Sequence, residues 1–143
     1  MSKKEPKVVK EEDPNGANKD THAYMVVGTR FEIDKRYEII DPIGSGAYGV
    51  VVAAKDQSLP ASTDEGGESN LCAIKKIVKA FEHRVFSLRT YRELKIQRLL
   101  DHENVLGIKR ILMPKSRENF NEIYVVSELM ETDLAQIIKS NQP

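Results

Sequence analysis

Short runs of β-branched and aromatic residues alternate with polar, glycine-containing segments over most of the chain. This pattern predicts strands over 37–43, 50–54, 71–78, 105–113 and 122–128. Residues 86–100 contain good helix formers and neither glycine nor proline, so we expect a helix there. A second, short helix is expected over 133–138, with Thr132 as its N-cap. The expected order is three strands, a helix, two strands and a helix.

Two segments lack this pattern. Residues 1–23 combine charged residues, Asn, Gly and Pro with little apolar content, which predicts a disordered N-terminal arm with order beginning near Tyr24. Residues 58–70 are rich in Gly, Ser and acidic residues, so we expect a loop.

Composition narrows the class of protein. The 143 residues carry a formal net charge of +0, which argues against a general nucleic-acid binder. A single cysteine, Cys72, excludes an internal disulfide framework. The N-terminus has no apolar stretch typical of a signal peptide, and no segment approaches the length of a membrane span. We therefore expect a cytoplasmic and nuclear protein, with neither membrane nor nucleic acid as a partner.

A glycine cluster, Gly44-Ser45-Gly46-Ala47-Tyr48-Gly49, matches the pattern GxGxxG. By itself this pattern is equally typical of a plain turn. Glycine suits phosphate binding because a Cβ would obstruct the approach of backbone N–H groups to phosphate oxygens. In a Rossmann dinucleotide fold the glycines open a helix, whereas here three valines follow and favour a strand. The cluster therefore predicts a hairpin that folds over phosphates.

Lys75 lies in the third expected strand. Side chains alternate along a strand, so Ala73 and Lys75 share one face. Most strand lysines are simply solvated, but this one follows the glycine hairpin and precedes a helix that carries Glu93. We expect Glu93 to pair with Lys75 and to hold its ammonium group against phosphates.

These motifs together resemble the N-lobe signature of eukaryotic protein kinases. The segments 44–51, 73–77, 89–95, 102–105 and 129–134 are similar to those of the mitogen-activated protein (MAP) kinases, in the extracellular-signal-regulated branch. The resemblance covers 37–143 and implies an α+β fold, with a five-stranded antiparallel sheet and one main helix. It divides the chain into an arm over 1–23, the ATP-binding N-lobe and hinge over 24–130, and the start of a truncated C-lobe over 131–143.

The resemblance also implies roles for individual residues. Ile43, Val51 and Ala73 would cover adenine, and the backbone of Glu128 and Met130 would bind its edge. Asp133 would meet the ribose, and Lys75 with the loop from Gly44 to Gly49 would bind the phosphates of ATP. Arg89 and Arg92 would receive a phosphorylated activation loop, although a solvated helix face explains them as well. The Mg²⁺ ligands would lie in a C-lobe, with none in this chain.

The chain departs from the family at three positions. Gln97 and Arg98 stand on the helix where the family prefers apolar residues. Ser127 occupies the position that gates the space behind adenine, and its small size predicts an enlarged back pocket that admits bulky purine-site inhibitors.

The family's HRD, DFG and APE motifs do not occur, and His22, His83 and His102 are isolated. We therefore expect the 143-residue chain to be inactive alone. Two interpretations stay open. The chain is the ATP-binding portion of a serine/threonine kinase, with an upstream MAP kinase kinase and protein substrates as partners of the parent. Alternatively, it is a non-catalytic truncated isoform that acts as a binding or interfering module.

Overall fold

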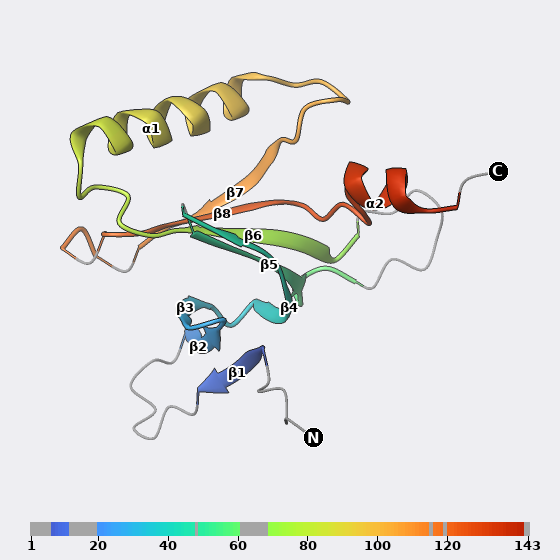
Figure 1. Ribbon diagram of the computed structural model, residues 1–143. Coiled ribbons are helices and arrows are strands. Elements are labelled where there is room, and N and C mark those ends of the chain that lie inside the picture. The colour runs from blue at the N-terminus through green and yellow to red at the C-terminus, as the bar shows by residue number, and fades with distance from the viewer. Residues whose placement is uncertain are drawn as a thin grey trace.

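A computed structural model describes residues 7–11, 20–47, 49–60, 69–114, 116–118 and 120–141. It contains two antiparallel sheets and two helices (Figure 1). The smaller sheet has the order β1-β2-β3, from Val8–Glu11, Thr21–Val26 and Thr29–Asp34. The larger has the order β4-β5-β6-β8-β7, from Tyr37–Gly46, Gly49–Asp56, Leu71–Ile77, Ile123–Glu128 and Ile108–Leu112. The helices are α1, Arg84–Leu99, and α2, Leu134–Lys139. The five-stranded antiparallel sheet and its helix confirm the predicted fold class.

The three-stranded sheet corrects the expected disordered arm. Residues 8–11 and 21–23 form strands, while 1–6 and 12–19 of that arm lie outside the described residues. β1 is an edge strand whose backbone pairs with β2, so it needs only one half-buried apolar contact, from Val8. The charged residues around Val8 and Val9 hid this short strand, which pairing with β2 stabilises.

One face of the large sheet packs against the small sheet, below it in Figure 1. The buried cluster between them draws side chains from β2 and β3 and from the inner face of β4, β5, β6 and β8. Its members include Tyr24, Val26, Phe31, Ile33, Tyr37, Val52, Ile74 and Val126. Alternate residues of each strand supply this core, as expected for a sheet with two different faces.

A buried lysine joins the two sheets. Lys76 is 5% exposed, and its Nζ lies 2.6 Å from Glu122 Oε2 and donates to the carbonyl of Arg30 on β3. Tyr124 accepts a hydrogen bond from the backbone N–H of Glu32 at 3.1 Å and donates to Glu122 Oε1 at 2.7 Å. The lysine charge is thus paired and hydrogen bonded, which a buried charge requires.

The opposite face of the large sheet packs against α1. The second buried cluster contains Ile77, Ala80, Ile123 and Val125, with Phe86 and Leu94 packed against it.

The N-cap of α2 differs from the expected one. The side chain of Asp133, and not that of Thr132, accepts a hydrogen bond from the backbone N–H of Gln136 at the start of α2.

Candidate nucleotide-binding site

The strand register brings several predicted site residues together on the face of the large sheet that packs against α1. On β6, Ala73 lies opposite Ser127 of β8, and Lys75 lies opposite Val51 of β5. Directly opposed residues of antiparallel strands project from the same face of a sheet. Val51, Ala73, Lys75 and Ser127 therefore form one continuous strip, and Ser127 is half-buried within it.

The predicted ion pair forms between this strip and α1. Lys75 Nζ lies 3.0 Å from Glu93 Oε1, and both side chains remain more than one third exposed. An exposed pair of this kind adds little to stability, because water screens it and both side chains lose freedom. Its effect is to hold the Lys75 ammonium group in one place above the strip.

The glycine hairpin is formed by β4 and β5, with Gly46 opposite Gly49. Gly49 has a φ of +138°, and a Cβ there would lie 1.8 Å from the carbonyl oxygen of Lys76, so the fold itself requires this glycine. A Cβ at Gly46 would meet nothing within 4 Å, and one at Gly44 would meet Val51 at an ordinary 3.9 Å. Packing therefore requires glycine at Gly49, the third glycine of the motif, but not at Gly44 or Gly46. Tyr48 lies outside the described residues.

The two ends of β6 mark the two ends of the site. Ile77, at one end, is opposite Gly49 of the hairpin, and Cys72, near the other, is opposite Glu128 at the end of β8. Met130 follows Glu128 and is largely exposed. The strip therefore runs from the end of β8, where the carbonyl of Glu128 accepts from the Ser127 hydroxyl at 3.5 Å, to the glycine hairpin with Lys75.

Other predicted residues lie further from this strip or have other partners. Ile43 is exposed at a register shift in β4. Both carboxylate oxygens of Asp133 accept hydrogen bonds from Gln136, so a ribose hydroxyl would compete with the cap of α2. Arg89 and Arg92 lie on exposed positions of α1. Gln97 is half-buried and Arg98 is exposed.

The Cys72 thiol and the possible metal ligands limit the chemistry available near this strip. Burial raises the pKa of the Cys72 thiol to about 11, so it is no nucleophile at neutral pH. Among the described residues, no three His, Cys, Asp or Glu side chains lie close enough to hold a metal ion. The described residues thus bring a paired lysine to the strip, and they do not by themselves fit a magnesium site.

Sequence reasoning missed Lys76, the neighbour of Lys75. The two lysines point to opposite faces of β6, one to the strip and one into the core between the sheets. The alternation of β6 could have revealed it, because Lys76 is in phase with the buried Cys72 and Ile74.

Comparisons with known proteins agree with this geometry. A family profile for protein tyrosine and serine/threonine kinases matches residues 37–143. The chain is 50% identical to Mitogen-activated protein kinase 4 of rice over 131 residues, which are 91% of this chain and 33% of that protein. It is 48% identical to Mitogen-activated protein kinase 7 of Arabidopsis over 132 residues, 92% of this chain and 33% of that protein.

The chain thus spans about a third of the length of these curated relatives. No helix within the described residues is both long and apolar enough to cross a membrane. Because the family profile covers 37–143, and the fold is that of a kinase N-lobe, the chain belongs to the protein kinase family and corresponds to the N-terminal lobe of a MAP kinase.

Proposed function

We propose that the strip formed by Val51, Ala73, Lys75 and Ser127 binds ATP, and that the chain is the ATP-binding portion of a MAP-kinase-like serine/threonine kinase. The observation that carries this proposal is the glycine hairpin. Packing does not require a glycine at Gly46, whereas close approach of backbone N–H groups to phosphates does. The Lys75–Glu93 pair, 3.0 Å apart on the same face, supplies the matching cation.

Each part of the strip would contact a different part of ATP. The flat apolar surface of Val51 and Ala73 suits a purine ring, and the backbone of Glu128 and Met130 would bind its edge. Lys75 would contact the α and β phosphates while Glu93 holds it in place. Mg²⁺, when bound, would neutralise phosphate charge, and its ligands would have to come from outside the described residues.

The activity of the whole protein is part of the same proposal. The relatives carry the name mitogen-activated protein kinase, which suggests an upstream MAP kinase kinase and protein substrates with serine or threonine acceptors. A signalling kinase of this type would work in the cytoplasm and the nucleus.

A binding assay with trinitrophenyl-ATP, a fluorescent analogue, tests the nucleotide site. Lys75→Met should weaken binding about tenfold or more, because a hydrogen bond to a charged group contributes about 1.5–3 kcal/mol. Gly46→Val should also weaken binding while leaving the thermal unfolding midpoint unchanged, since its Cβ meets open space.

Val85→Ser, at an exposed position of α1, serves as the matched control and should bind as the unchanged protein does. Gly49→Ala should instead lower the unfolding midpoint, because its Cβ collides with the Lys76 carbonyl. Equal analogue affinity in Lys75→Met, Gly46→Val and the control would refute the proposed site.

A further inference from the structure

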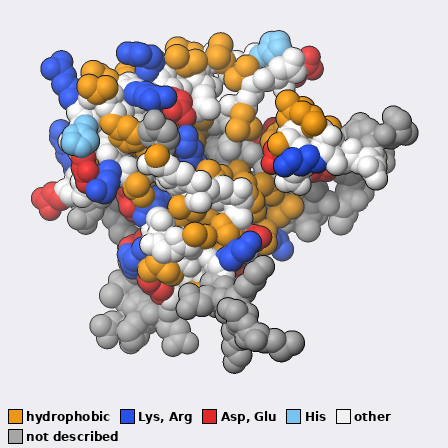
Figure 2. All heavy atoms as spheres, in the orientation of Figure 1, with side chains coloured by type: hydrophobic (Ala, Val, Ile, Leu, Met, Phe, Trp, Pro, Cys, Tyr) orange, Lys and Arg blue, Asp and Glu red, His pale blue; other side chains and the backbone are white. Residues whose placement is uncertain are grey.

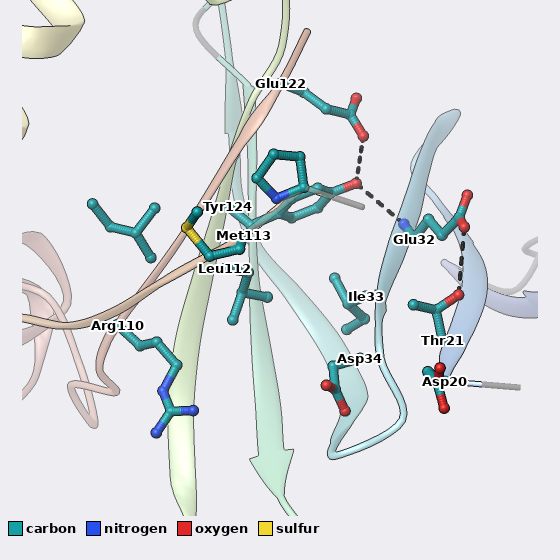
Figure 3. A pocket seen from close by; sticks show the side chains of 12 residues that line it. Asp20, Thr21, Glu32, Ile33, Asp34, Arg110, Leu112, Met113, Glu122 and Tyr124 are labelled. Atoms are coloured by element: carbon teal, nitrogen blue, oxygen red, sulfur yellow. Dashed lines mark hydrogen bonds between the residues drawn. The ribbon is translucent and has the colours of Figure 1, made fainter. Parts of the chain in front are cut away.

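A pocket lies between the two sheets, on the face of the large sheet opposite to the one that carries Lys75. It has a volume of about 630 Å³, within the ~300–1,000 Å³ typical of ligand sites. Residues of β2 and β3 form one wall, and β7, β8 and the segment after β7 form the other (Figure 3).

The pocket meets β7 along its edge. Five consecutive residues, 110–114, line it, although alternate side chains of a strand point to opposite faces. Arg110, Ile111 and Leu112 belong to β7, and Met113 and Pro114 follow it directly, so the pocket extends along the end of this strand. β7 is the last strand of the large sheet, so within the described residues no further strand pairs with the outer edge of its 110–112 segment. Such an edge is a template for an additional strand.

The facing edge, β3, is already occupied. Side chains of the large sheet bind its outward backbone groups, with Tyr124 accepting from the N–H of Glu32 and Lys76 donating to the carbonyl of Arg30. The acidic groups next to it are also paired: Glu32 with Arg30 at 2.9 Å and Glu122 with Lys76 at 2.6 Å. β7 is therefore the edge that remains available in this pocket.

Opposite charges face each other across the pocket mouth. Arg110 extends from β7 on one side, and Asp34 and Asp20 lie on the other (Figure 3). The side chains of Arg110 and Asp20 form neither a hydrogen bond nor an ion pair with another described residue. One oxygen of Asp34 accepts from the backbone N–H of Arg36, which leaves its second oxygen for a ligand.

Apolar side chains complete the lining. Ile33 is buried at the base, Leu112 is half-buried, and Met113 is 86% exposed beside the mouth. A large apolar side chain with this exposure gains most when a partner covers it. The metal-binding alternative is excluded within the described residues, because no three acidic, His or Cys side chains gather there.

We propose that this pocket binds an extended peptide segment of a partner protein, which adds to the free edge of β7. The segment presents an apolar side chain over Met113 and Leu112, flanked two residues away on one side by an acidic residue and on the other by a basic residue. The acidic residue pairs with Arg110, and the basic residue pairs with Asp34 and Asp20. Main-chain hydrogen bonds supply affinity and these side chains supply selectivity, as in other strand-addition sites. The inference does not rest on the nucleotide site.

Fluorescein-labelled peptides of the pattern Thr-Glu-Thr-X-Thr-Lys-Thr, with Leu, Ile, Phe or Met at X, are the probes. Alternation places Glu, X and Lys on one face of the extended peptide. We expect saturable anisotropy changes with the full 143-residue chain. In amide NMR spectra of the ¹⁵N-labelled chain, the amides of β7 should shift and gain protection from exchange, while those beside Lys75 stay unchanged.

Variants of exposed residues test the contacts without a folding risk. Met113→Ser should weaken binding about tenfold through lost apolar contact, and Asp34→Asn or Arg110→Gln about twofold to fivefold each. Asp34→Asn keeps an acceptor for the Arg36 N–H. Asp101→Asn, at an exposed loop position, and Val85→Ser are matched controls and should change nothing.

Three results would overturn the proposal. One is the absence of saturable binding for all four probes. Another is undiminished binding by probes with proline on both sides of X, because proline cannot donate to a strand ladder. The third is concentration-dependent dimerisation in sedimentation experiments that Met113→Ser abolishes, which would assign the β7 edge to a second copy of the chain.

Discussion

The turn between β2 and β3 places a β-branched residue in an unfavourable conformation. Val27 and Gly28 have φ values of +47° and +74°, and they form the two-residue loop of this hairpin. Two positive φ angles are typical of the turns that match the twist of paired strands, and such turns favour Asn-Gly. Glycine tolerates this region, whereas valine is strained there by its branched side chain.

Val27→Asn should therefore stabilise the protein. Val27 is 55% exposed, so little packing is lost, and relief of the strain should raise the free energy of unfolding by about 1 kcal/mol. Urea unfolding measures this as a higher midpoint with an unchanged slope. Gly28→Ala is the control and should lower the midpoint. An unchanged or lower midpoint in Val27→Asn would show that Val27 carries no such strain.

At the start of the large sheet, the buried carboxylate of Asp56 forms an ion pair with Arg36 through two hydrogen bonds. Arg36 Nε and Nη2 donate to the two oxygens of Asp56 at 2.7 and 2.6 Å, and Asp56 is 6% exposed. The hydrogen bond from Arg36, with others from Ser58, lowers the pKa of Asp56 to about 2 from the usual 3.8. The paired arginine thus keeps this carboxyl ionised over most of the accessible pH range.

This pair should make stability depend on acid pH. The folded pKa lies below the unfolded one, so the contribution is fully present above about pH 4 and is lost as the pH falls towards 2. The contribution of the pair to the free energy of unfolding amounts to about 2 kcal/mol, since one pKa unit corresponds to about 1.4 kcal/mol. Urea unfolding of the unchanged protein and of Asp56→Asn at several pH values measures it. Parallel curves for the two proteins between pH 4 and 2 would contradict the assignment.

At the scale of elements, a polar network connects β3 to β6 and β8 through an otherwise apolar core. Its members are Lys76, Glu122 and Tyr124 with the backbone of Arg30 and Glu32. Burial raises the pKa of the Tyr124 hydroxyl, so it stays protonated and keeps donating to Glu122. A network in which each member has partners favours one relative position of the two sheets.

Tyr124→Phe should weaken this connection. It leaves the N–H of Glu32 without its partner, at a cost of about 1–3 kcal/mol in the free energy of unfolding. Hydrogen exchange should speed up at the Glu32 amide more than at the amides of β6. Tyr91→Phe, on an exposed position of α1, is the matched control. If the Glu32 amide exchanges at the same rate in Tyr124→Phe, the hydroxyl does not hold β3.

At the scale of the whole molecule, the two faces of the large sheet contact different parts of the structure. One face is buried against the small sheet, and the other carries α1 and the strip that we propose binds ATP. Figure 2 shows hydrophobic side chains gathered on the surface over α1 and α2. The exposed apolar residues there include Val85, Leu88, Tyr91, Leu99, Leu134, Ile137 and Ile138. An exposed apolar surface of this kind favours association with another surface.

The chain itself should transfer no phosphate to a generic protein substrate with Mg-ATP. Its described residues hold the Lys75–Glu93 pair, but no three His, Cys, Asp or Glu side chains among them could hold the metal ion that phosphoryl transfer requires. The measurement is radiolabel transfer from γ-labelled ATP to myelin basic protein. Activity that survives in Lys75→Met would indicate a contaminant, whereas activity lost in that variant would refute the prediction.

The local pattern along the chain was enough to locate the large sheet and its main helix. The β-branched runs predicted all five strands of that sheet, and the helix expected over 86–100 is α1, Arg84–Leu99. Alternation along β6 also placed Ala73 and Lys75 on one face, and the position of Glu93 on a following helix predicted their pair. The strands, the helix and the shared face depend on neighbours in sequence, which a linear pattern records directly, whereas the pair between Lys75 and Glu93, 18 residues apart, followed from the order of the motifs.

Tertiary structure decided the features that depend on distant contacts. β1 holds Val8 and Val9, which favour a strand, but only pairing with β2 shows that this four-residue segment forms one. Lys76 is buried because Glu122 and the Arg30 carbonyl, far away in sequence, neutralise and satisfy it. The sequence by itself determined a glycine-rich hairpin followed by Lys75 and Glu93. Only the packed sheets distinguished Gly49, where a Cβ would collide with the Lys76 carbonyl, from Gly46, where a Cβ would meet nothing within 4 Å. That difference depends on the distance to a neighbouring strand, which the sequence does not record.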